Sequence, residues 1–325
     1  MRILSADDVR RAVPMPAAID AVAAAFAQLS AGHANVPLRT PIAQERLQSH
    51  TFFMPAHLAQ SNALGMKVVS VFPQNAQHGM PVIHALVVVL DAETGRPLAA
   101  MDGTYLTALR TGAASGVATQ ALARADAHVL ALFGAGAQAP GQVAAVCAVR
   151  PIKRVLIVNR TRERAEALIA TLQAQGVQAE VQITTSAAAA LREADVVCCA
   201  TSATTPLFDD HDVRPGTHIN GVGSFTPAMA EVPVATIGRA RVFVDQRAAA
   251  WSEAGDLINA RAAHVLTEDG TTEIGAVLAG MATGRTDPQE ITFFKSVGNA
   301  VQDVAVAQRA LAAAERMGLG VEVAL

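Results

Sequence analysis

Cysteine, aromatic residues and charge are all scarce in this chain of 325 residues. Its three cysteines, Cys147, Cys198 and Cys199, form no Cys-x-x-Cys pair, which argues against a thiolate zinc site and a disulfide framework. The 25 Lys and Arg against 28 Asp and Glu leave a net charge of −3, so we expect no nucleic acid and no membrane as partner. No apolar run approaches the ~20 residues that span a bilayer. Acidic Asp7 and Asp8 argue against a signal peptide, and we expect a cytoplasmic protein.

The pattern along the chain predicts two kinds of architecture. Hydrophobic residues make up 51%, which excludes a disordered chain, and the length predicts roughly two domains. Residues 17–31 have helical apolar spacing, and residues 33–102 hold short β-type runs with a turn at 91–95. These predict one helix and a mostly antiparallel sheet. Strands and helices then alternate over 127–245, which indicates a doubly wound parallel sheet, and 299–317 predicts a final helix.

A glycine-rich turn follows the first strand of the alternating region. The apolar run 129–133 leads into Gly134, Gly136 and Ala139, spaced as Gly-x-Gly-x-x-Ala. The first glycine suits a tight turn, the second lets the backbone approach a pyrophosphate, and the small third residue lets helix and strand pack closely. A strand before the turn and a helix after it favour a dinucleotide site over an ordinary glycine-rich turn. Thr201, at the end of a later strand, is expected at the same edge.

The end of the second strand in this region distinguishes the two nicotinamide cofactors. NAD enzymes carry an acid there, which binds the ribose 2′-hydroxyl. This chain instead has Arg160 and Arg162, within Asn-Arg-Thr-Arg at 159–162, and guanidinium groups suit a 2′-phosphate. The sequence therefore predicts NADPH, with NADH as the alternative. Solvent-exposed arginines at a helix start are the other interpretation.

Three basic residues lie among apolar or small neighbours: Lys67, Arg39 and Arg110. Burying a cation is costly without a partner, and no acid is close to Lys67 in the sequence. A bound anion, such as a substrate carboxylate, is the partner we infer, although each side chain could instead extend to solvent. His84, in a β-type run, could transfer a proton or be a satisfied core histidine. The histidines form no metal-binding pattern, so we expect no metal.

Several stretches together resemble the ornithine cyclodeaminase/mu-crystallin family over nearly the whole chain. They lie at 65–68, 90–99, 102–115, 134–139 and 294–303. The strings Leu-Arg-Thr-Gly-Ala at 109–113 and Lys-Ser-Val-Gly at 295–298 are the most specific. The resemblance implies an α/β chain with a doubly wound Rossmann domain, expected over 116–299. It also implies a mixed α+β substrate-binding and dimerisation domain, expected over 1–115 with 300–325, and a homodimer.

The resemblance also implies roles for individual residues. The family's ligands of the substrate carboxylate map onto Arg39, Lys67 and Arg110, and we also count His84 and Phe225 with the substrate. Its cofactor contacts map onto Thr111, Ala137, Gln138, Thr201, Val222, Ser296 and Val297. Asn159, Arg160 and Thr161 resemble the NADPH-type members, and we add Gly134, Gly136, Arg162 and Arg110 to the cofactor contacts.

One departure from the family pattern bears on the reaction. Members that cyclise ornithine carry an aspartate after the fifth strand, where this chain has Phe225, which cannot transfer a proton. The local form Gly-Ser-Phe-Thr-Pro is similar to members that reduce Δ1-pyrroline-2-carboxylate or Δ1-piperideine-2-carboxylate to L-proline or L-pipecolate. We therefore expect a cyclic ketimine reductase. Lys67 would be a carboxylate ligand, the proton donor, or the base of a donor water.

Three alternatives to a ketimine reductase stay open at this point. The first is an alanine-type dehydrogenase, which would aminate a linear 2-oxo acid with free ammonia. The second is an ornithine cyclodeaminase, against which Phe225 argues. The third is a non-catalytic nicotinamide-nucleotide-dependent binding protein of the crystallin type, against which the joint presence of Lys67, Arg39 and Arg110 argues.

Overall fold

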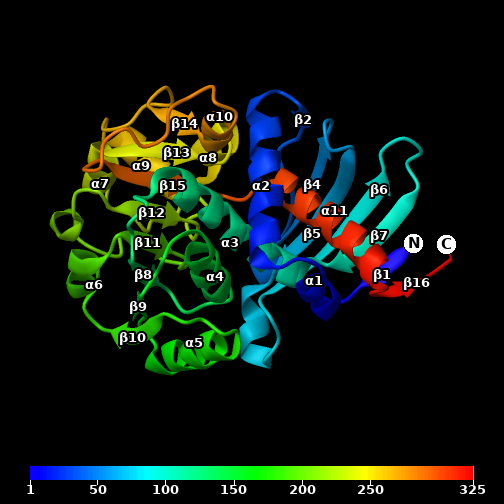
Figure 1. Cartoon of the computed structure of the whole chain (residues 1–325), viewed down its shortest axis with the longest axis horizontal. Coiled ribbons are helices and arrows are strands. Elements are labelled where there is room, and N and C mark those ends of the chain that lie inside the picture. The colour runs from blue at the N-terminus through cyan, green and yellow to red at the C-terminus, as the bar shows by residue number, and fades with distance from the viewer. Residues whose placement is uncertain (325) are drawn as a thin grey trace. The chain divides into compact units, whose positions relative to one another are not determined.

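The structure is a computed structural model that describes residues 1–324, and the chain divides into two compact units. We name Met1–Arg110 together with Asn299–Leu325 the terminal unit, and Thr111–Gly298 the central unit. Each unit has its own sheet (Figure 1). The chain begins in the terminal unit, then forms the whole central unit, and returns to the terminal unit with its last helix.

A mixed sheet forms the body of the terminal unit. Its order is β16-β1-β7-β6-β5-β4-β2, and β3 also pairs with β4. The strands are β1 (Arg2–Leu4), β2 (Ala34–Asn35), β3 (Thr40–Gln44), β4 (Ser49–Leu58), β5 (Ala63–Val71), β6 (Ile83–Asp91), β7 (Pro97–Asp102) and β16 (Val321–Glu322). Strands β4 to β7 are antiparallel, as the β-type runs predict. Asp91 closes the β6–β7 hairpin by accepting the N–H groups of Glu93 and Thr94.

Helices α2 and α11 pack against this sheet. The helices of the unit are α1 (Ala6–Ala12), α2 (Met15–Ser30) and α11 (Ala300–Met317). In Figure 1, α11 lies across β4, β5 and β6 and beside α2. Side chains of a strand alternate between faces, and Ala63, Gly65, Lys67 and Val69 of β5 are buried. A Cβ atom at Gly65 would lie 3.4 Å from Val304 of α11, so this is the face that α11 covers.

No single helix within residues 1–324 is long and apolar enough to cross a membrane. Helices α1 and α2 reach that length and hydropathy only as a pair, bent by 83°.

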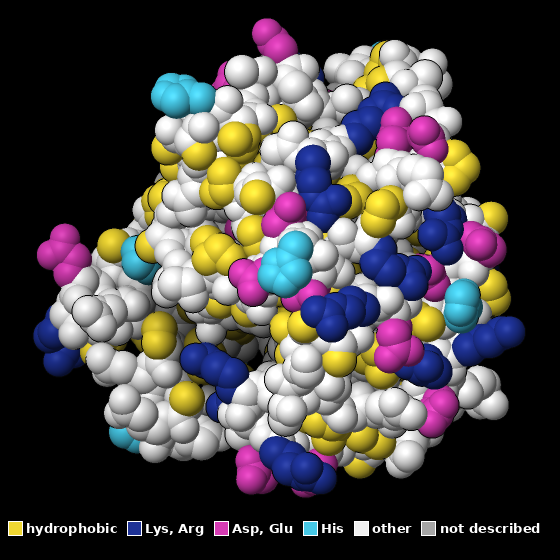
Figure 2. Space-filling model, turned by 90° about the vertical axis from the view of Figure 1, so that its left-hand side faces the viewer, with side chains coloured by type: hydrophobic (Ala, Val, Ile, Leu, Met, Phe, Trp, Pro, Cys, Tyr) yellow, Lys and Arg dark blue, Asp and Glu magenta, His cyan; other side chains and the backbone are white. Residues whose placement is uncertain are grey.

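On the face drawn in Figure 2, basic side chains are intermixed with acidic ones. Basic and acidic side chains of the central unit also form ion pairs with one another. Arg192 lies 2.9 Å from Asp212, and Arg239 lies 2.7 Å from Asp210.

The central unit contains an eight-stranded sheet in which every pairing is parallel. Its order is β10-β9-β8-β11-β12-β15-β13-β14. The strands are β8 (Val129–Phe133), β9 (Arg154–Val158), β10 (Glu180–Thr184), β11 (Val196–Cys199), β12 (His218–Gly221), β13 (Ala240–Val244), β14 (Thr271–Glu273) and β15 (Ile291–Lys295). The chain runs outward from β8 in both directions, which creates the switch point where doubly wound sheets bind ligands. This confirms the predicted fold class.

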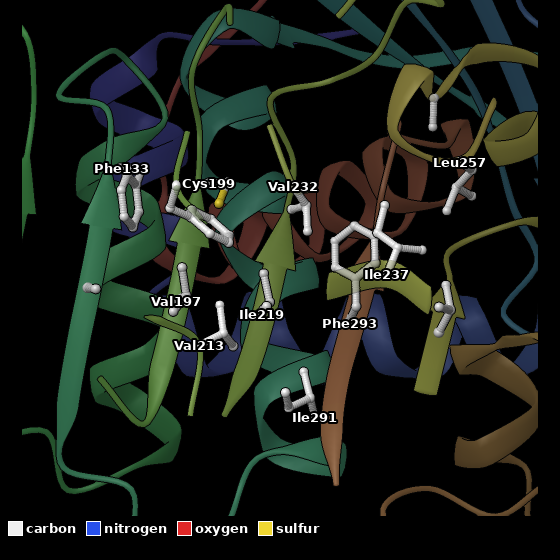
Figure 3. Packing of buried hydrophobic residues seen from close by; sticks show 14 of the residues in the cluster. Phe133, Val197, Cys199, Val213, Ile219, Val232, Ile237, Leu257, Ile291 and Phe293 are labelled. Atoms are coloured by element: carbon white, nitrogen blue, oxygen red, sulfur yellow. The ribbon is translucent and has the colours of Figure 1, made fainter. Parts of the chain in front are cut away.

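Apolar side chains from alternate positions of β8 build a core on each face of this sheet. Leu130 and Leu132 belong to one buried cluster, and Val129, Ala131 and Phe133 belong to the other. Figure 3 shows the second cluster, in which Phe133 and residues of the neighbouring strands point toward one face of the sheet. The helices that follow the strands are α4 (Ala139–Val149), α5 (Arg162–Ala174), α6 (Ala187–Glu193), α7 (Val234–Arg239), α8 (Arg247–Glu253), α9 (Gly255–Ala262) and α10 (Ile274–Leu278).

Helix α3 (Gly103–Leu122) carries the chain from one unit to the other. The sequence predicts domain boundaries at 115/116 and 299/300. In the structure the two compact units meet along the chain at 110/111 and 298/299. Strands β14 and β15 fall outside the strands predicted from the sequence. β15 nevertheless lies inside the sheet, between β12 and β13.

Candidate active site

Lys67 is buried in the terminal unit, with 1% of its surface exposed. It stands on β5 between Met54 of β4 and Val87 of β6, on the face that α11 covers. Its Nζ donates to Oδ1 of Asp303 at 2.9 Å and lies 2.8 Å from Oδ2. The sequence led us to infer a bound anion as the partner of Lys67, whereas the structure gives it an acid of the chain itself. The fold brings in an acid from 236 residues further along the chain.

Arg110 binds the same carboxylate. From α3, its Nε donates to Oδ1 of Asp303 at 2.9 Å, and its Nη1 donates to Oε1 of Gln302 at 2.6 Å. Both partners lie in the first turn of α11, where Asn299 caps the helix by accepting the N–H of Val301 at 3.0 Å. Sequence reasoning assigned none of these α11 residues to the site. A signal exists, because two adjacent polar residues begin a helix whose inward face is otherwise apolar.

Arg39 adds a third cation to this group. It is half-buried directly before β3, and its guanidinium lies 4.8 Å from the centre of the Phe52 ring. Phe52 is on the same face of β4 as Met54, which pairs with Lys67. We call Lys67, Arg110, Arg39 and Asp303 the cation cluster. The structure thus brings together the three basic residues that the sequence singled out.

Burial and charge set the protonation of Lys67. Burial, followed by the charge of Arg110, lowers the pKa of Lys67 from 10.5 to about 8, against the opposing effect of Asp303. A lysine with this pKa exchanges a proton close to neutral pH. Lys67 and Arg110 share the one carboxylate of Asp303, so positive charge is in excess among these three groups. Nε2 of Gln302 is a buried donor without a hydrogen-bond partner. The cluster can therefore take up an anion and supply a proton.

His84 lies on the other face of the same sheet. It pairs with Ser70 of β5, whose side chain points away from the face of Lys67, and it is exposed. The interpretation of His84 as a core histidine is therefore wrong. The sequence around His84 could not show on which face of the sheet its side chain lies, because β5 and β6 carry apolar residues on both faces.

The glycine turn has the shape that a pyrophosphate site needs. Gly134 has φ +99°, and a Cβ atom there would lie 2.7 Å from the carbonyl oxygen of Ala200, so only glycine fits. A Cβ atom at Gly136 would have no atom within 4 Å, which leaves the backbone open to a ligand. Helix α4 begins directly after Ala137 and Gln138. Its free N–H groups favour an anion at this end.

Asn159 ties the glycine turn to the turn that follows β9. Its Oδ1 accepts the N–H of Ala135 at 3.0 Å, and its Nδ2 donates to the carbonyl oxygen of Thr161 at 2.7 Å. Thr161 directly precedes helix α5. The two turns on which a dinucleotide's adenosine half would lie are therefore held as one piece.

The arginines beside Asn159 differ in their surroundings. Arg160 is exposed at the end of β9, while Arg162 forms an ion pair with Glu166 one helical turn away, at 2.8 Å. Residues 159–162 contain no carboxylate that would repel a phosphate. Of the two guanidinium groups, Arg160 is the better placed for a 2′-phosphate because Arg162 already has an acid.

The other predicted cofactor contacts follow three adjacent strands. They are Thr201 after β11, Val222 after β12, and Ser296 with Val297 after β15. Parallel strands end at one edge of the sheet, so these residues share the edge of the glycine turn. Thr201 donates to Glu231 from N at 2.7 Å and from Oγ1 at 2.8 Å, and the Ser296 hydroxyl donates to Asp245 at 2.7 Å. Sequence reasoning missed both of these buried acids.

Phe225 is half-buried and packs against the apolar cluster of Figure 3. It has no ionisable group, in keeping with the departure that the sequence shows at this position.

Thr111 is buried on α3 and belongs to the central unit, whereas its neighbour Arg110 belongs to the terminal unit. Arg110 contacts Asp303 and Gln302, so its expected contact with the cofactor stays a prediction.

The chain is similar to known proteins over nearly its whole length. Residues 1–315 match the model of the ornithine cyclodeaminase/mu-crystallin family. The chain is 39% identical over 322 residues to a Δ1-pyrroline-2-carboxylate reductase of Bacillus cereus, covering 98% of each chain. It is similar to the structure of Thermococcus litoralis Δ1-pyrroline-2-carboxylate reductase in complex with NADH and L-proline, with 37% identity, TM-score 0.95, and coverage of 99% and 100%. It is also similar to an archaeal alanine dehydrogenase dimer with bound NAD, with 33% identity, TM-score 0.92, and coverage of 100% and 99%.

Proposed function

The chain belongs to the ornithine cyclodeaminase/mu-crystallin family, and on that basis we propose that it is a cyclic ketimine reductase. It reduces Δ1-pyrroline-2-carboxylate, Δ1-piperideine-2-carboxylate or both to L-proline and L-pipecolate, with a reduced nicotinamide cofactor. The cation cluster is the observation that carries this proposal, because a small acid with an imine needs an anion site and a proton. The names of the Bacillus cereus and Thermococcus litoralis relatives support it.

The substrate carboxylate is the anion that the cluster receives. Arg39 and Arg110 bind it, and guanidinium groups suit a carboxylate because they present paired donors. Lys67 and Arg110 share the single negative charge of Asp303, so this pair keeps a positive charge in excess, which attracts the substrate. Fixing the carboxylate fixes the orientation of the ring, and such positioning supplies a large part of the rate.

Lys67 supplies the proton that the ring nitrogen needs. The hydride for the new C–H bond at C2 is the chemistry that a bound nicotinamide supplies. As the C–H bond forms, the electron pair of the C=N bond moves to the nitrogen, which must carry a proton to become the product amine. We assign that proton to Nζ of Lys67, whose pKa of about 8 suits general acid catalysis near neutral pH.

The proposal excludes ornithine cyclisation as the main activity, because Phe225 cannot accept or donate a proton. The test is a substrate panel followed by the absorbance of the reduced nicotinamide. It contains the five- and six-membered cyclic imines, pyruvate with ammonia, and ornithine with NAD. We expect turnover with the imines. Turnover only with pyruvate and ammonia would make the protein an alanine-type dehydrogenase, and turnover only with ornithine would contradict our interpretation of Phe225.

The central unit is the cofactor-binding domain in this proposal, and the terminal unit is the substrate-binding and dimerisation domain. The Thermococcus litoralis relative is in complex with NADH, so both nicotinamide cofactors have to be tested. Exposed Arg160, and the absence of an acid in residues 159–162, favour NADPH for this chain. The expected result is a lower KM for NADPH than for NADH.

A homodimer is the assembly we propose. The sheet face opposite α11 exposes apolar side chains, including Leu86 at 46% and Ile42 at 51% exposure. A second copy would bury such a patch, and the similar alanine dehydrogenase is described as a dimer. We also propose a cytoplasmic location, because Cys147, Cys198 and Cys199 are all free thiols.

A further inference from the structure

Glu231 is a fully buried acid that joins two of the strand ends predicted to contact the cofactor. Its Oε1 accepts the N–H of Thr201 at 2.7 Å and the hydroxyl of Thr201 at 2.8 Å. Its Oε2 accepts the N–H of Gly223 at 2.8 Å and that of Ser224 at 2.9 Å. One carboxylate therefore holds the segment that follows β11, at Thr201, and the segment that follows β12, at Gly223 and Ser224, in a fixed relation.

We infer that Glu231 is the positioning residue for the nicotinamide half of the cofactor. The inference rests on the proposed nicotinamide-dependent function. In a doubly wound sheet, the glycine turn and the strand beside it take the adenosine half. The strands on the other side of the switch point, here β11 and β12, then take the nicotinamide half. Glu231 acts through Thr201 and through the backbone after Val222, and we assign it no contact with the cofactor.

The position of Glu231 is itself tightly determined. Its N–H donates to Oδ1 of Asp256 at 2.7 Å, and the N–H of Val232 donates to the same oxygen at 3.1 Å. Asp256 lies in the first turn of α9, and its Oδ2 lies 3.3 Å from Nζ of Lys295 at the end of β15. We call Glu231, Asp256 and Lys295 the buried acid cluster. It links the ends of β11, β12 and β15 to α9.

The chemistry of this site requires a carboxylate. Four donors point at its two oxygens, and an ionised carboxylate has about four lone-pair positions and no donor of its own. Glutamine would leave one oxygen for these four donors and would turn an amide N–H toward the rest. Space is also limited, because a Cβ atom at residue 223 would lie 2.3 Å from Oε1 of Glu231, which explains Gly223.

A buried carboxylate stays ionised only where nearby groups stabilise its negative charge, and Lys295 and Thr201 do so for Glu231. Burial raises the pKa of the Glu231 carboxyl and so does the charge of Asp256, while the nearby charge of Lys295 opposes that rise. The hydrogen bonds from Thr201 act in the same direction as Lys295. Together they favour the acceptor-only form that the four donors require.

The test compares the whole cofactor with its adenosine half. Binding of NADPH and of 2′-phospho-ADP-ribose to the wild-type chain and to Glu231→Gln is measured by isothermal titration calorimetry. We expect the affinity of the variant for NADPH to fall about ten- to hundredfold, the range for losing charge-assisted hydrogen bonds. We expect the affinity for 2′-phospho-ADP-ribose to stay within about twofold, because the turns after β8 and β9 do not depend on Glu231.

Asp195→Asn is the matched control. Asp195 is also a buried acid of the central unit, and it accepts the N–H groups of His128 and Val129 at 2.9 and 3.1 Å. These bonds lie at the opposite end of β8, away from the glycine turn. We expect the control to lower the melting temperature while both ligands keep their wild-type affinities.

The possible outcomes separate the inference from the proposed function. A wild-type chain that binds no nicotinamide nucleotide contradicts the proposed function. If the wild-type chain binds NADPH, equal NADPH affinity in Glu231→Gln contradicts the inference, as does an equal loss for both ligands. Should Glu231→Gln not fold, Glu231→Asp keeps the charge on a shorter side chain and tests the same difference. We expect it also to lose NADPH affinity selectively.

Discussion

Replacing Asp303 by asparagine should move the pH dependence of the reaction to lower pH. Asp303 is the single acid of the cation cluster, and its two oxygens lie 2.9 and 2.8 Å from Nζ of Lys67. Arg110 and Arg39 face the same amine with positive charge. The substitution keeps the shape of the side chain and removes its negative charge, so protonated Lys67 is left among like charges.

The distances set the size of the effect. Two unit charges about 3 Å apart interact by about 5 kcal/mol at an effective dielectric constant of about 20. The asparagine oxygen still accepts a hydrogen bond, so the fall in the pKa of Lys67 should be about one to three pH units, the usual effect of an opposite charge. Starting from a pKa of about 8, a fall of two pH units would lower the protonated fraction at pH 7.5 about 25-fold.

The assay is kcat/KM for the cyclic imine between about pH 5.5 and 9.5, with saturating cofactor, because this quantity reports the free enzyme. Wild-type activity should fall above about pH 8, where Lys67 loses its proton. Activity of Asp303→Asn should fall at lower pH. The ionisation of the imine is common to both enzymes and cancels. Asp20→Asn, an exposed acid of α2, should leave the profile unchanged. Superimposable profiles for wild type and Asp303→Asn would refute Lys67 as the proton donor.

The remaining predictions concern single substitutions with separate readouts. Lys67→Met should lower kcat/KM by at least about a hundredfold and remove the fall in activity above about pH 8, the pKa of Lys67; unchanged kinetics would remove Lys67 from the mechanism. Arg160→Ser should raise the KM for NADPH about tenfold and leave that for NADH unchanged, since one charge-assisted hydrogen bond to phosphate is lost; equal effects on both would argue against a 2′-phosphate contact. Leu86→Glu should convert the dimer to monomers in sedimentation velocity, and an unchanged dimer would place the interface elsewhere. Gly134→Ala should lower the free energy of unfolding in urea by at least about 1 kcal/mol, whereas Gly136→Ala should keep wild-type stability and weaken NADPH binding in calorimetry.

The sequence predicted most of the central unit because its signals are local. Strand, glycine turn and helix follow one another within about 20 residues, and each step of the alternation has its own pattern. β15 was missed for a physical reason. Its apolar run, within Ile291–Lys295, is short, is interrupted by Thr292 and ends on a lysine, and the described residues between α10, which ends at Leu278, and this strand form no helix. Only the neighbours of β15 in the sheet identify it as an interior strand.

The sequence predicted the burial of Lys67 and failed to predict its partner. Apolar flanks are enough to predict burial, because they lie next to Lys67 in the chain. Asp303 comes from a helix at the other end of the sequence, and only the terminal sheet brings the two together. His84 shows the same limit in another form. Its face is decided by the register of β6 against β5, which pairs it with Ser70.

Each unit contains a buried cluster of acids and bases, and their charge balance gives them different roles. In the cation cluster, Lys67 and Arg110 share one acid, Asp303, so an incoming carboxylate improves the balance. In the buried acid cluster, Glu231 and Asp256 outnumber Lys295, and their oxygens accept backbone N–H groups. No anion is favoured there, so that cluster acts on the backbone. Burying such groups is rarely the most stable solution for a core, since well-packed apolar residues are often as stable or more so. Anion binding in one unit and loop positioning in the other account for both clusters.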